Sequence, residues 1–455
     1  MDRLLLKNCF HIQPSADGEA LRGGDILVEG GLISRIGTDL EAGEAARTVD
    51  CSTHVVVAGF VNTHHHFFQT LTRNLPAVQD AKLFDWLTHL YGIWERIDDE
   101  AVHVSSLLAM GELLKTGCTT TTDHLYLYPH GFGADFMDLQ FQAAARLGVR
   151  FCPARGSMSR GRSDGGLPPD SVVQDEEDIL VDCERAIRGF HDPSPHAMRK
   201  VALAPCSPFS VSEELLRQTV ELARRNGVRL HTHLAETADE DAFCVEKYGV
   251  RPLALMERCG FLGPHVSFAH GIHFDDGELA VLARSGAQIA HCPSSNMRLG
   301  SGICRVRDML DRGIPVSLAV DGSASNDTSD FLAEMRQAML LQRVARGSGA
   351  LGARETLKMA TETGAAVLGF PGEGVLAEGR HADIAVFDVS GPEFSGSLSD
   401  PLAALLFCGT SHEADYVVCD GRLVVDGGRL TGIDEEDLAR DGRRISSRLT
   451  GARTW

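Results

Sequence analysis

Histidine and carboxylate side chains recur in this chain just after apolar stretches, with types and spacing that suit a bound metal ion. His64 and His66 are separated by one residue and follow the apolar run 54–58. At a strand end, such a pair can project to one side of the chain and bind one ion. His233 and Asp321 also follow apolar runs, so three imidazoles and one carboxylate are available. This donor set suits zinc with an open position for water, and ligand type alone leaves iron and manganese open.

These polar groups lie where short apolar strands give way to loops. The stretches 228–233, 266–270 and 315–320 each read as a strand that ends near a histidine or an aspartate. Between Gly59 and roughly Gly364 the chain alternates strand and helix patterns in about eight units, which predicts a parallel sheet. A (β/α)₈ barrel requires that number of units, and its catalytic groups collect at the carboxyl ends of the strands.

Both ends of the chain have a different, β-rich texture. Near the start, 4–12, 25–29 and 32–36 read as strands, with Gly30-Gly31 as a hairpin turn. Near the end, the sequence predicts strands at 381–387, 415–419 and 422–426. We therefore expect a small β-sandwich domain built from residues 1–58 and 366–455, and a catalytic (β/α)₈ barrel over residues 59–365.

Two helices carry clear boundary signals. Ser210 and Glu213 have the spacing of a capping box, and Gly227 is a plausible stop for the helix that follows. A second helix is predicted over 276–286, directly before a strand at 287–290.

The composition excludes several classes of function. With 455 residues, 43% of them hydrophobic, the chain can bury a large core, and 23% charged residues is ordinary for a globular protein. The formal net charge of −20 argues against non-specific nucleic-acid binding, although a free nucleobase carries no phosphate and stays possible as a substrate. No apolar stretch is long enough to cross a bilayer, and the first residues are too short and interrupted for a signal peptide. Twelve cysteines without CxxC spacing indicate reduced, buried thiols, so we expect a cytoplasmic protein.

The motifs together resemble those of the amidohydrolase superfamily, in the branch that holds aminohydrolases of purines, pterins and triazines. The matching segments follow the order expected of that family and cover essentially the whole chain: Asn62-Thr63-His64-His65-His66, His233-Leu234-Ala235-Glu236, Ala269-His270-Gly271, 291–296, 321–326 and the terminal pattern 379–383.

The resemblance implies hydrolytic deamination of a free oxidised purine, in which 8-oxoguanine and water give urate and ammonia. The segments 64–73, 155–159, 164–169, 204–210 and 298–304 support this choice within the branch. Deamination of isoxanthopterin and removal of an amine from a hydroxylated triazine are the alternatives. A non-enzymatic scaffold protein is the alternative from another class, but such relatives typically lack part of the metal set. The resemblance also implies a homo-oligomer.

Roles for the central residues can be argued beside the resemblance. One divalent ion, zinc before iron or manganese, would be held by His64, His66, His233 and Asp321. Asp321 is expected to take the proton of the attacking water, and Glu236 to protonate a ring nitrogen beside the attacked carbon. His270 is expected to polarise the water or to stabilise the developing charge.

The substrate pocket is expected to include residues from several strand ends. Gln69 continues a His-x-His-x-x-Gln pattern that resembles guanine deaminases, in which the amide contacts the base. Those enzymes carry an arginine at the end of the fourth strand, where this chain has Cys206, so a reshaped pocket is expected. Arg155 is a candidate replacement donor, with a solvent salt bridge as the alternative reading. Trp86 is a candidate stacking residue, and His124 is a further candidate for the pocket.

Other histidines and cysteines have more ordinary interpretations. His65 should point away from the ligands and pack. His231 shares the side of His233 and is expected to line the barrel interior, with a direct role as the alternative. For His291 two interpretations are open, a place at the edge of the site and a structural hydrogen bond. Phe84, two residues before Trp86, is expected to pack in the core. Catalysis by a thiol is not expected, so Cys118, Cys292 and Cys304 are read as small buried residues.

Overall fold

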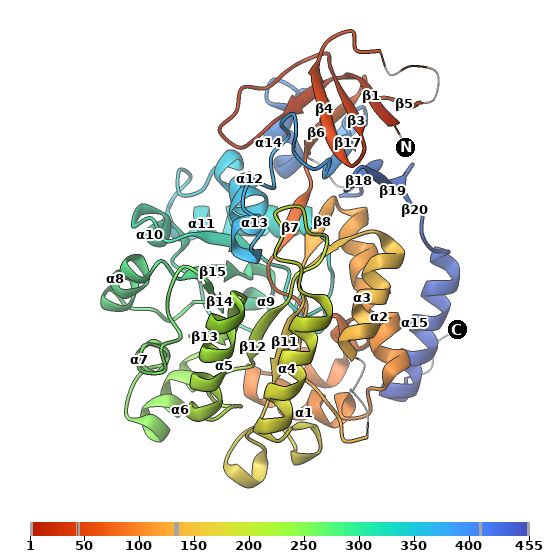
Figure 1. The fold of residues 1–455 in the computed structure, drawn as a ribbon. Coiled ribbons are helices and arrows are strands. Elements are labelled where there is room, and N and C mark those ends of the chain that lie inside the picture. Colours follow the sequence, from red (N-terminus) through yellow and green to blue (C-terminus); the bar gives the residue numbers. More distant parts are fainter. Residues whose placement is uncertain (1–2, 42, 44–45, 132–135, 409–411, 453–455) are drawn as a thin grey trace.

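The computed structural model describes residues 3–41, 43, 46–131, 136–408 and 412–452, which form a barrel with a β-sandwich at one end (Figure 1). In the described part of the chain the barrel strands, in order, are β7 (Phe60–Asn62), β8 (Cys118–Thr121) with β9 (His124–Leu125), β10 (Arg150–Phe151) with β11 (Ala154–Ser157), β12 (Ala202–Pro205), β13 (Arg229–Leu234), β14 (Val266–His270), β15 (Gln288–His291) and β16 (Val316–Leu318).

Hydrogen bonds between parallel neighbours run around the whole barrel. A seven-stranded sheet extends from β16 to β9, and β10, β8 and β7 continue it. The ring closes where Thr63 N–H donates to the Leu318 carbonyl at 3.2 Å and Asp321 N–H donates to the His64 carbonyl at 3.1 Å. The predicted (β/α)₈ barrel is therefore confirmed.

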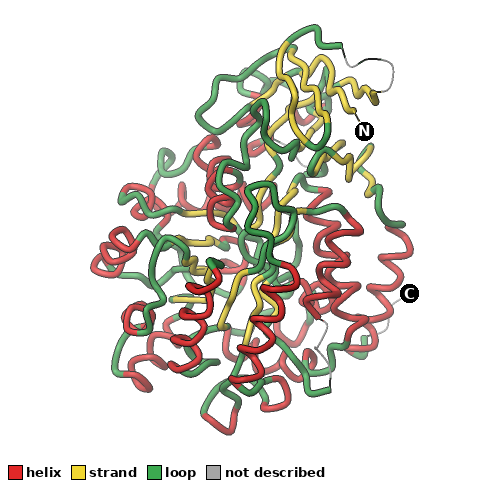
Figure 2. The backbone as a smooth tube through the Cα atoms, viewed as in Figure 1, coloured by secondary structure: helices red, strands yellow, loops and turns green. Residues whose placement is uncertain are grey.

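Helices surround the strands, as Figure 2 shows. The α-helices are α1 (Leu83–Trp94), α2 (Asp99–Lys115), α3 (Phe136–Leu147), α4 (Glu176–Phe190), α5 (Glu213–Asn226), α6 (Ala238–Tyr248), α7 (Pro252–Arg258), α8 (Asp276–Ser285), α9 (Pro293–Arg298), α10 (Val306–Asp311), α11 (Phe331–Arg346), α12 (Ala353–Ala360), α13 (Glu362–Leu368), α14 (Pro401–Phe407) and α15 (Glu435–Thr450). Short 3₁₀ helices are η1 (Phe67–Thr72), η2 (Pro76–Val78), η3 (Arg162–Asp164), η4 (Asp170–Val172) and η5 (Pro392–Phe394). Within the described residues, we find no helix with the length and apolar character needed to span a membrane.

Two sheets from the two ends of the chain form the sandwich. The strands are β1 (Arg3–Cys9), β2 (His11–Gln13), β3 (Gly24–Glu29), β4 (Leu32–Gly37), β5 (Ala46–Asp50), β6 (His54–Ala58), β17 (Ile384–Asp388), β18 (Tyr416–Cys419), β19 (Arg422–Asp426) and β20 (Arg429–Leu430). One sheet has the order β4-β3-β1-β5 and the other β2-β6-β17-β18-β19-β20. Leu6 and Ile26 of the first sheet share a buried cluster with Val56 and Ile384 of the second. The predicted sandwich and its Gly30-Gly31 hairpin are confirmed.

Two strand predictions need correction. The stretch 4–12, predicted as one strand, is divided at Phe10 into β1 and β2, which lie in different sheets. The run 54–58 is β6, and it pairs with β17 of the sandwich. The strand that directs His64 and His66 is instead the three-residue β7, which pairs with β8 of the barrel.

Helix boundaries follow local capping. Ser212, and not Ser210, caps α5, because its hydroxyl accepts from Leu215 N–H at 2.9 Å. Gly227 ends that helix in the left-handed region, at φ 64°, as predicted. The predicted helix over 276–286 is α8, with Gly286 as its left-handed stop.

The last helix returns to the barrel. Ser446 of α15 donates its hydroxyl hydrogen to the Leu71 carbonyl at 2.8 Å, and Arg448 pairs with Asp98 at 2.6 Å. Figure 1 shows α15 beside α2, away from the sandwich. We therefore propose two domains, a β-sandwich of residues 1–58 and 366–455 and a barrel of residues 59–365. One amendment is needed, because α15 packs as an outer layer of the barrel.

Candidate metal centre and active site

The carboxyl ends of the barrel strands bring the four predicted ligands together. Asp321 Oδ1 lies 3.3 Å from His64 Nε2 and 3.4 Å from His66 Nε2. His66 Nε2 lies 3.1 Å from His233 Nε2. The side chains of His64, His66 and Asp321 are buried, and that of His233 is partly exposed. They converge from the residues after β7, from β13 and from the loop after β16.

Hydrogen bonds on the far side of each ring fix which nitrogens face inward. His66 Nδ1–H donates to the His124 carbonyl at 2.7 Å, and His233 Nδ1–H donates to the Cys206 carbonyl at 2.6 Å. Their Nε2 lone pairs therefore face each other, and His64 Nε2 is buried without a hydrogen-bond partner among the described residues. Bare lone pairs packed against a carboxylate are costly unless a cation lies between them. The residues present thus fit a divalent metal ion.

The imidazoles are also in the protonation state that metal binding needs. Burial, followed by the charge of His66, lowers the pKa of His233 to about 4. Burial likewise lowers the pKa of His64 and of His66 below the ordinary histidine value. Neutral rings can bind an ion at pH 7 without first releasing protons.

A hydrogen-bond chain supports His64 from behind. His64 Nδ1 lies 2.8 Å from His231 Nε2, and His231 Nδ1 lies 2.8 Å from Ser267 Oγ. His231 is buried in the barrel interior, as expected. It contacts a ligand and not the pocket, so it orients the ring of His64.

Replacing His231 with alanine is expected to weaken metal binding by about 10- to 100-fold, the usual effect of losing such a supporting partner. His64 Nδ1–H would lose its acceptor, and its ring orientation would no longer be fixed. The measurement is the metal retained per chain in competition with a chelator. His231→Gln offers an amide oxygen in place of the ring nitrogen and should recover part of the affinity, whereas equal retention in all three proteins would refute the role.

The acid–base residues lie beside the ligands. His270 Nε2 is 3.5 Å from Glu236 Oε2, and Asn296 Nδ2 donates to His270 Nδ1 at 3.0 Å. This bond leaves the ring hydrogen on Nε2, directed toward Glu236. His270 can therefore donate a hydrogen bond within the site. Asn296 belongs to the motif 291–296, which does not by itself predict this contact.

The pKa values of the two carboxyl groups are shifted in opposite directions. Burial, then the charges of Asp321 and Glu240, raises the pKa of Glu236 well above its usual range. Burial would raise the pKa of Asp321 too, but contact with the imidazoles of His64, His270 and His66 holds that pKa well below its usual range. A pair of carboxyls separated in this way indicates one acid and one base.

Backbone geometry at the strand ends directs these side chains. Ala235, His270 and Asp321 have positive φ angles of 54°, 74° and 62°. Residues other than glycine rarely adopt this region, and the strain concentrates at functional sites. Each turn redirects the chain just where a strand ends, so that His270, Asp321 and the residue after Ala235 project into one space.

Glu240 is a functional residue that the sequence did not reveal. Its two carboxylate oxygens accept from Ala235 N–H at 2.9 Å and from Glu236 N–H at 3.0 Å. Burial raises the pKa of Glu240 to about 7. It fixes the turn that presents Glu236. Its position, four residues after Glu236 in the first turn of α6, is the signal that could have suggested this contact.

A small cavity of about 40 Å³ adjoins the cluster. Its lining combines the acid–base groups and ligands with α1 and loop residues: His66, Gln69, Leu83, Trp86, Leu87, Tyr91, Tyr126, Cys206, Ser207, Phe209, His233, Glu236, His270, Leu299, Asp321 and Ser325. A larger hollow of about 650 Å³ lies between α2 and α15, but none of the catalytic candidates lines it. The small cavity is the one that the chemistry supports.

Three of the predicted substrate residues line this cavity. The Nε1–H of Trp86 is buried without a hydrogen-bond partner among the described residues. The Gln69 amide oxygen accepts from Ala324 N–H at 3.3 Å, which leaves its NH₂ group to donate to a ligand. Glycine is required at Gly322, because a Cβ there would lie 1.9 Å from the Gln69 amide oxygen. Cys206 completes the set, and burial raises the pKa of its thiol to about 12, so it is no nucleophile at neutral pH.

Arg155 does not reach the cavity, contrary to our prediction. Its guanidinium is buried behind the sheet, where Nε donates to Asp182 of α4 at 2.7 Å and the group stacks 3.9 Å from the Tyr128 ring centre. Arg155 lies within β11, and alternation along a strand turns its side chain outward toward the helices. Arg155 therefore forms a salt bridge, as the alternative interpretation held, but a buried one. It is not part of the substrate pocket.

His124 also lies outside the cavity lining. Its Nε2–H donates to the Ala204 carbonyl at 3.0 Å, and its ring stacks on His233 with centroids 4.9 Å apart. One of its ring nitrogens belongs to a group, with nitrogens of His64, His66 and His233, whose members all lie within 4.8 Å of one another. The structure thus places His124 beside the ligands, and its predicted contact with substrate is withdrawn.

The remaining candidates are structural neighbours. His65 Nε2 lies 3.0 Å from Ser329 Oγ, so the ring points away from the ligands. Phe84 packs on Phe209, with ring centroids 5.2 Å apart. Both ring nitrogens of His291 are buried without partners among the described residues, and it does not line the cavity. All twelve cysteines are free thiols.

Comparison with known proteins agrees with this geometry. The 8-oxoguanine deaminase of Pseudomonas aeruginosa is 44% identical over 450 residues, covering 99% of both chains. An isoxanthopterin deaminase from an unknown prokaryotic organism is 35% identical and covers 98% of this chain and 97% of its own. The crystal structure of an atrazine chlorohydrolase from Arthrobacter aurescens TC1, complexed with zinc, superimposes with a TM-score of 0.92 at 31% identity, covering 97% of this chain and all of that one.

The family match spans most of the chain, since residues 55–424 match the amidohydrolase family. That range contains every ligand and acid–base candidate described above. The chain therefore belongs to the amidohydrolase family and is a metal-dependent hydrolase of carbon–nitrogen bonds.

Proposed function

We propose that this protein deaminates a free oxidised purine, converting 8-oxoguanine and water to urate and ammonia. The observation that carries the proposal is geometric: the inward-facing imidazoles of the ligand cluster and the Asp321 carboxylate converge beside the buried pair of Glu236 and His270. The choice of substrate is supported by the 8-oxoguanine deaminase to which the chain is 44% identical.

The proposed metal is zinc, held by His64, His66, His233 and Asp321. Nitrogen donors and one carboxylate favour it over oxygen-preferring ions, and a structural neighbour is complexed with zinc. When bound, the ion would lower the pKa of a water molecule, so that hydroxide is available at neutral pH.

The protein's own groups then move the protons. Asp321, ionised in its histidine environment, accepts the proton of the attacking water. Glu236, neutral through burial, donates a proton to the ring nitrogen beside the attacked carbon, and its carboxyl group afterwards helps ammonia to leave. His270 donates a hydrogen bond from Nε2 to the oxygen that gains charge.

Three neighbouring side chains offer donors to a purine edge. Trp86 Nε1–H has no acceptor in the part of the chain that the structure describes. The NH₂ group of Gln69 remains after its oxygen accepts from Ala324, and the Cys206 thiol stands where guanine deaminases carry an arginine. Carbonyl oxygens of an oxidised purine are the acceptors that such donors need. We propose that Trp86 contributes its N–H, in place of the stacking role predicted from sequence.

Replacing Trp86 with phenylalanine is expected to lower kcat/KM for 8-oxoguanine about 10-fold, because one hydrogen bond to substrate is lost while the apolar wall is kept. Steady-state ammonia release measures the effect. Trp94→Phe is the matched control, since Trp94 lies on the same helix but its N–H donates to Thr72 Oγ1 at 3.1 Å. That control should lower thermal stability without changing KM, and an unchanged kcat/KM in Trp86→Phe would remove Trp86 from substrate recognition.

Ammonia release from metal-replete protein tests the proposed function on a panel of 8-oxoguanine, isoxanthopterin, guanine, cytosine and a hydroxylated triazine. A kcat/KM for 8-oxoguanine of at least about 10⁴ M⁻¹s⁻¹, well above the other compounds, is the expected result. A clear preference for isoxanthopterin would retain the chemistry and overturn the substrate. Inactivity on the whole panel by metal-loaded protein would overturn the proposal beyond the family level.

A further inference from the structure

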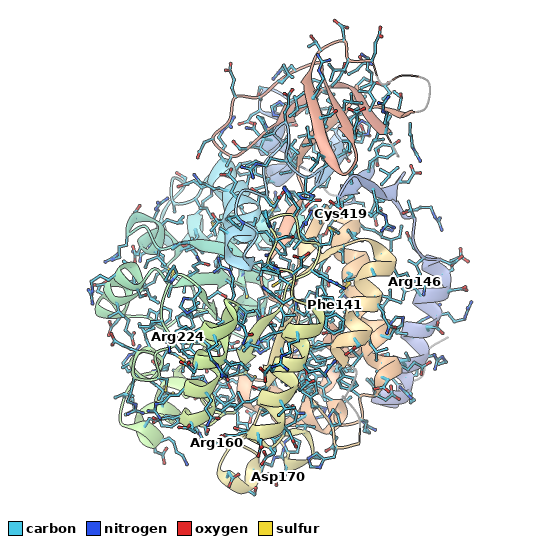
Figure 3. All side chains as sticks on the ribbon, viewed as in Figure 1. Phe141, Arg146, Arg160, Asp170, Arg224 and Cys419 are labelled. Atoms are coloured by element: carbon cyan, nitrogen blue, oxygen red, sulfur yellow. The ribbon has the colours of Figure 1, made fainter. Side chains whose placement is uncertain are left out.

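A second group of metal-ligating side chains lies at the opposite end of the barrel, where the strands begin and the sandwich is attached. One ligand atom each from His196, Glu373 and His381 lies within 4.8 Å of the others. His196 precedes β12, and Glu373 and His381 flank the segment that leads into β17. Figure 3 labels Cys419, the neighbour of Asp420, at this junction.

His381 is oriented as a metal ligand. Its Nδ1 lies 2.6 Å from Asp420 Oδ1, so Nδ1–H donates to that carboxylate. Its Nε2 lone pair then faces His196 Nδ1 at 2.7 Å. A carboxylate behind the outer nitrogen of a histidine is the usual support of a metal-bound imidazole, because it fixes the tautomer and the ring plane.

Glu373 is the feature that hydrogen bonding within the protein does not explain. The residue is 6% exposed, and no described residue donates a hydrogen bond to its carboxylate, whose oxygens keep only a small contact with solvent. Burial, then the charge of Asp383, raises the pKa of Glu373. A buried carboxylate without a partner is costly, and a cation in contact with it would remove that cost.

The nearby cations are already engaged or exposed. Arg150 donates Nε–H to Asp383 at 3.0 Å and approaches Asp420 only to 4.0 Å. Arg380 lies on the surface. The junction therefore holds three carboxylates, those of Glu373, Asp383 and Asp420, against the one buried guanidinium.

We propose that His196, Glu373 and His381 bind a second divalent cation, of the zinc class, at the junction of barrel and sandwich. Two imidazoles and one carboxylate suit zinc, with water as a further ligand. A hydrogen bond from His196 to His381 would explain the contact between the two rings. It would leave the negative charge of Glu373 without a partner. The ion joins a barrel loop to the segment entering the sandwich, so its role is to stabilise that junction. It lies at the barrel end away from the catalytic groups.

The test is the number of zinc ions per chain, measured by mass spectrometry after dialysis of the holoenzyme against micromolar zinc. The parent chain should hold about two ions, and Glu373→Gln and His196→Ala about one each. Glu373→Gln preserves size, and His196 is exposed, so neither change should prevent folding. The matched control is His89→Ala, which removes an exposed imidazole from α1 and should leave about two ions.

Added zinc should also raise the melting temperature of the parent more than that of either variant. Deaminase activity should stay within about two-fold of the parent in both variants, because the site is remote from the chemistry. A parent chain that holds one ion, or a variant that holds as many as the parent, would overturn the proposal. The metal count needs no substrate, so this result is independent of the proposed function.

Discussion

Replacing Glu236 with glutamine is expected to lower kcat about 10³-fold, within the range typical of a lost general acid. Glutamine keeps the size of the side chain and can donate a hydrogen bond, but it cannot deliver a proton to the ring nitrogen. The Glu236 N–H would still donate to Glu240, so the turn should persist. Ammonia release gives kcat, and calorimetry on the same variant should show that the substrate still binds.

The control for this change is Glu246→Gln, on the exposed face of α6. It should leave kcat unchanged. Metal content should equal that of the parent in both variants, because Glu236 is not among the proposed ligands. A fall of less than about 10-fold in Glu236→Gln would show that another group supplies the proton.

Removing the catalytic ion is expected to lower activity by about 10⁴-fold, because the ion supplies several kcal/mol of stabilisation and the nucleophile at neutral pH. The experiment is best made in the Glu373→Gln chain, where only the catalytic site should hold metal. Dialysis against a chelator followed by zinc should restore activity, whereas magnesium, which prefers oxygen ligands, should not.

A second readout separates metal binding from chemistry. The inward-facing lone pairs of His64, His66 and His233 lose their cation in the apo protein, so its melting temperature should fall. At a zinc concentration of 1,000 times the dissociation constant, linkage gives a stabilisation of about 4 kcal/mol. Full activity in protein shown to be metal-free would refute the hydrolytic mechanism.

The barrel and its proposed ligand set could be predicted from sequence because each ligand lies at or shortly after the end of a strand. In a parallel barrel all strands end at one edge, so the order of His64, His233, His270 and Asp321 along the chain already implies their convergence. Their roles stay predictions until the Glu236 and metal experiments are made.

The sequence does not show which side of a strand faces the interior of the barrel. Nearness to a strand end predicts Arg155 in the pocket. A shift of one residue along a strand moves a side chain to the opposite face of the sheet, and the side chain of Arg155 faces α4. The division of 4–12 into β1 and β2 could not be seen in the sequence, because no glycine or proline marks the break at Phe10. Asn296 acts on His270 through the fold, by a contact that no local pattern encodes, whereas the contact of Glu240 with Glu236 is local.

The size of the cavity has a consequence for the timing of catalysis. About 40 Å³ accommodates roughly three water molecules, far less than a bicyclic base. Leu83, Trp86 and Leu87 of α1 form part of its wall, so we expect these side chains to move when a bicyclic base enters and when its product leaves. Each turnover then includes two openings, and the slower of them can set kcat in place of the chemical step. A rate that declines as solvent viscosity increases would be the signature of such a gated cycle.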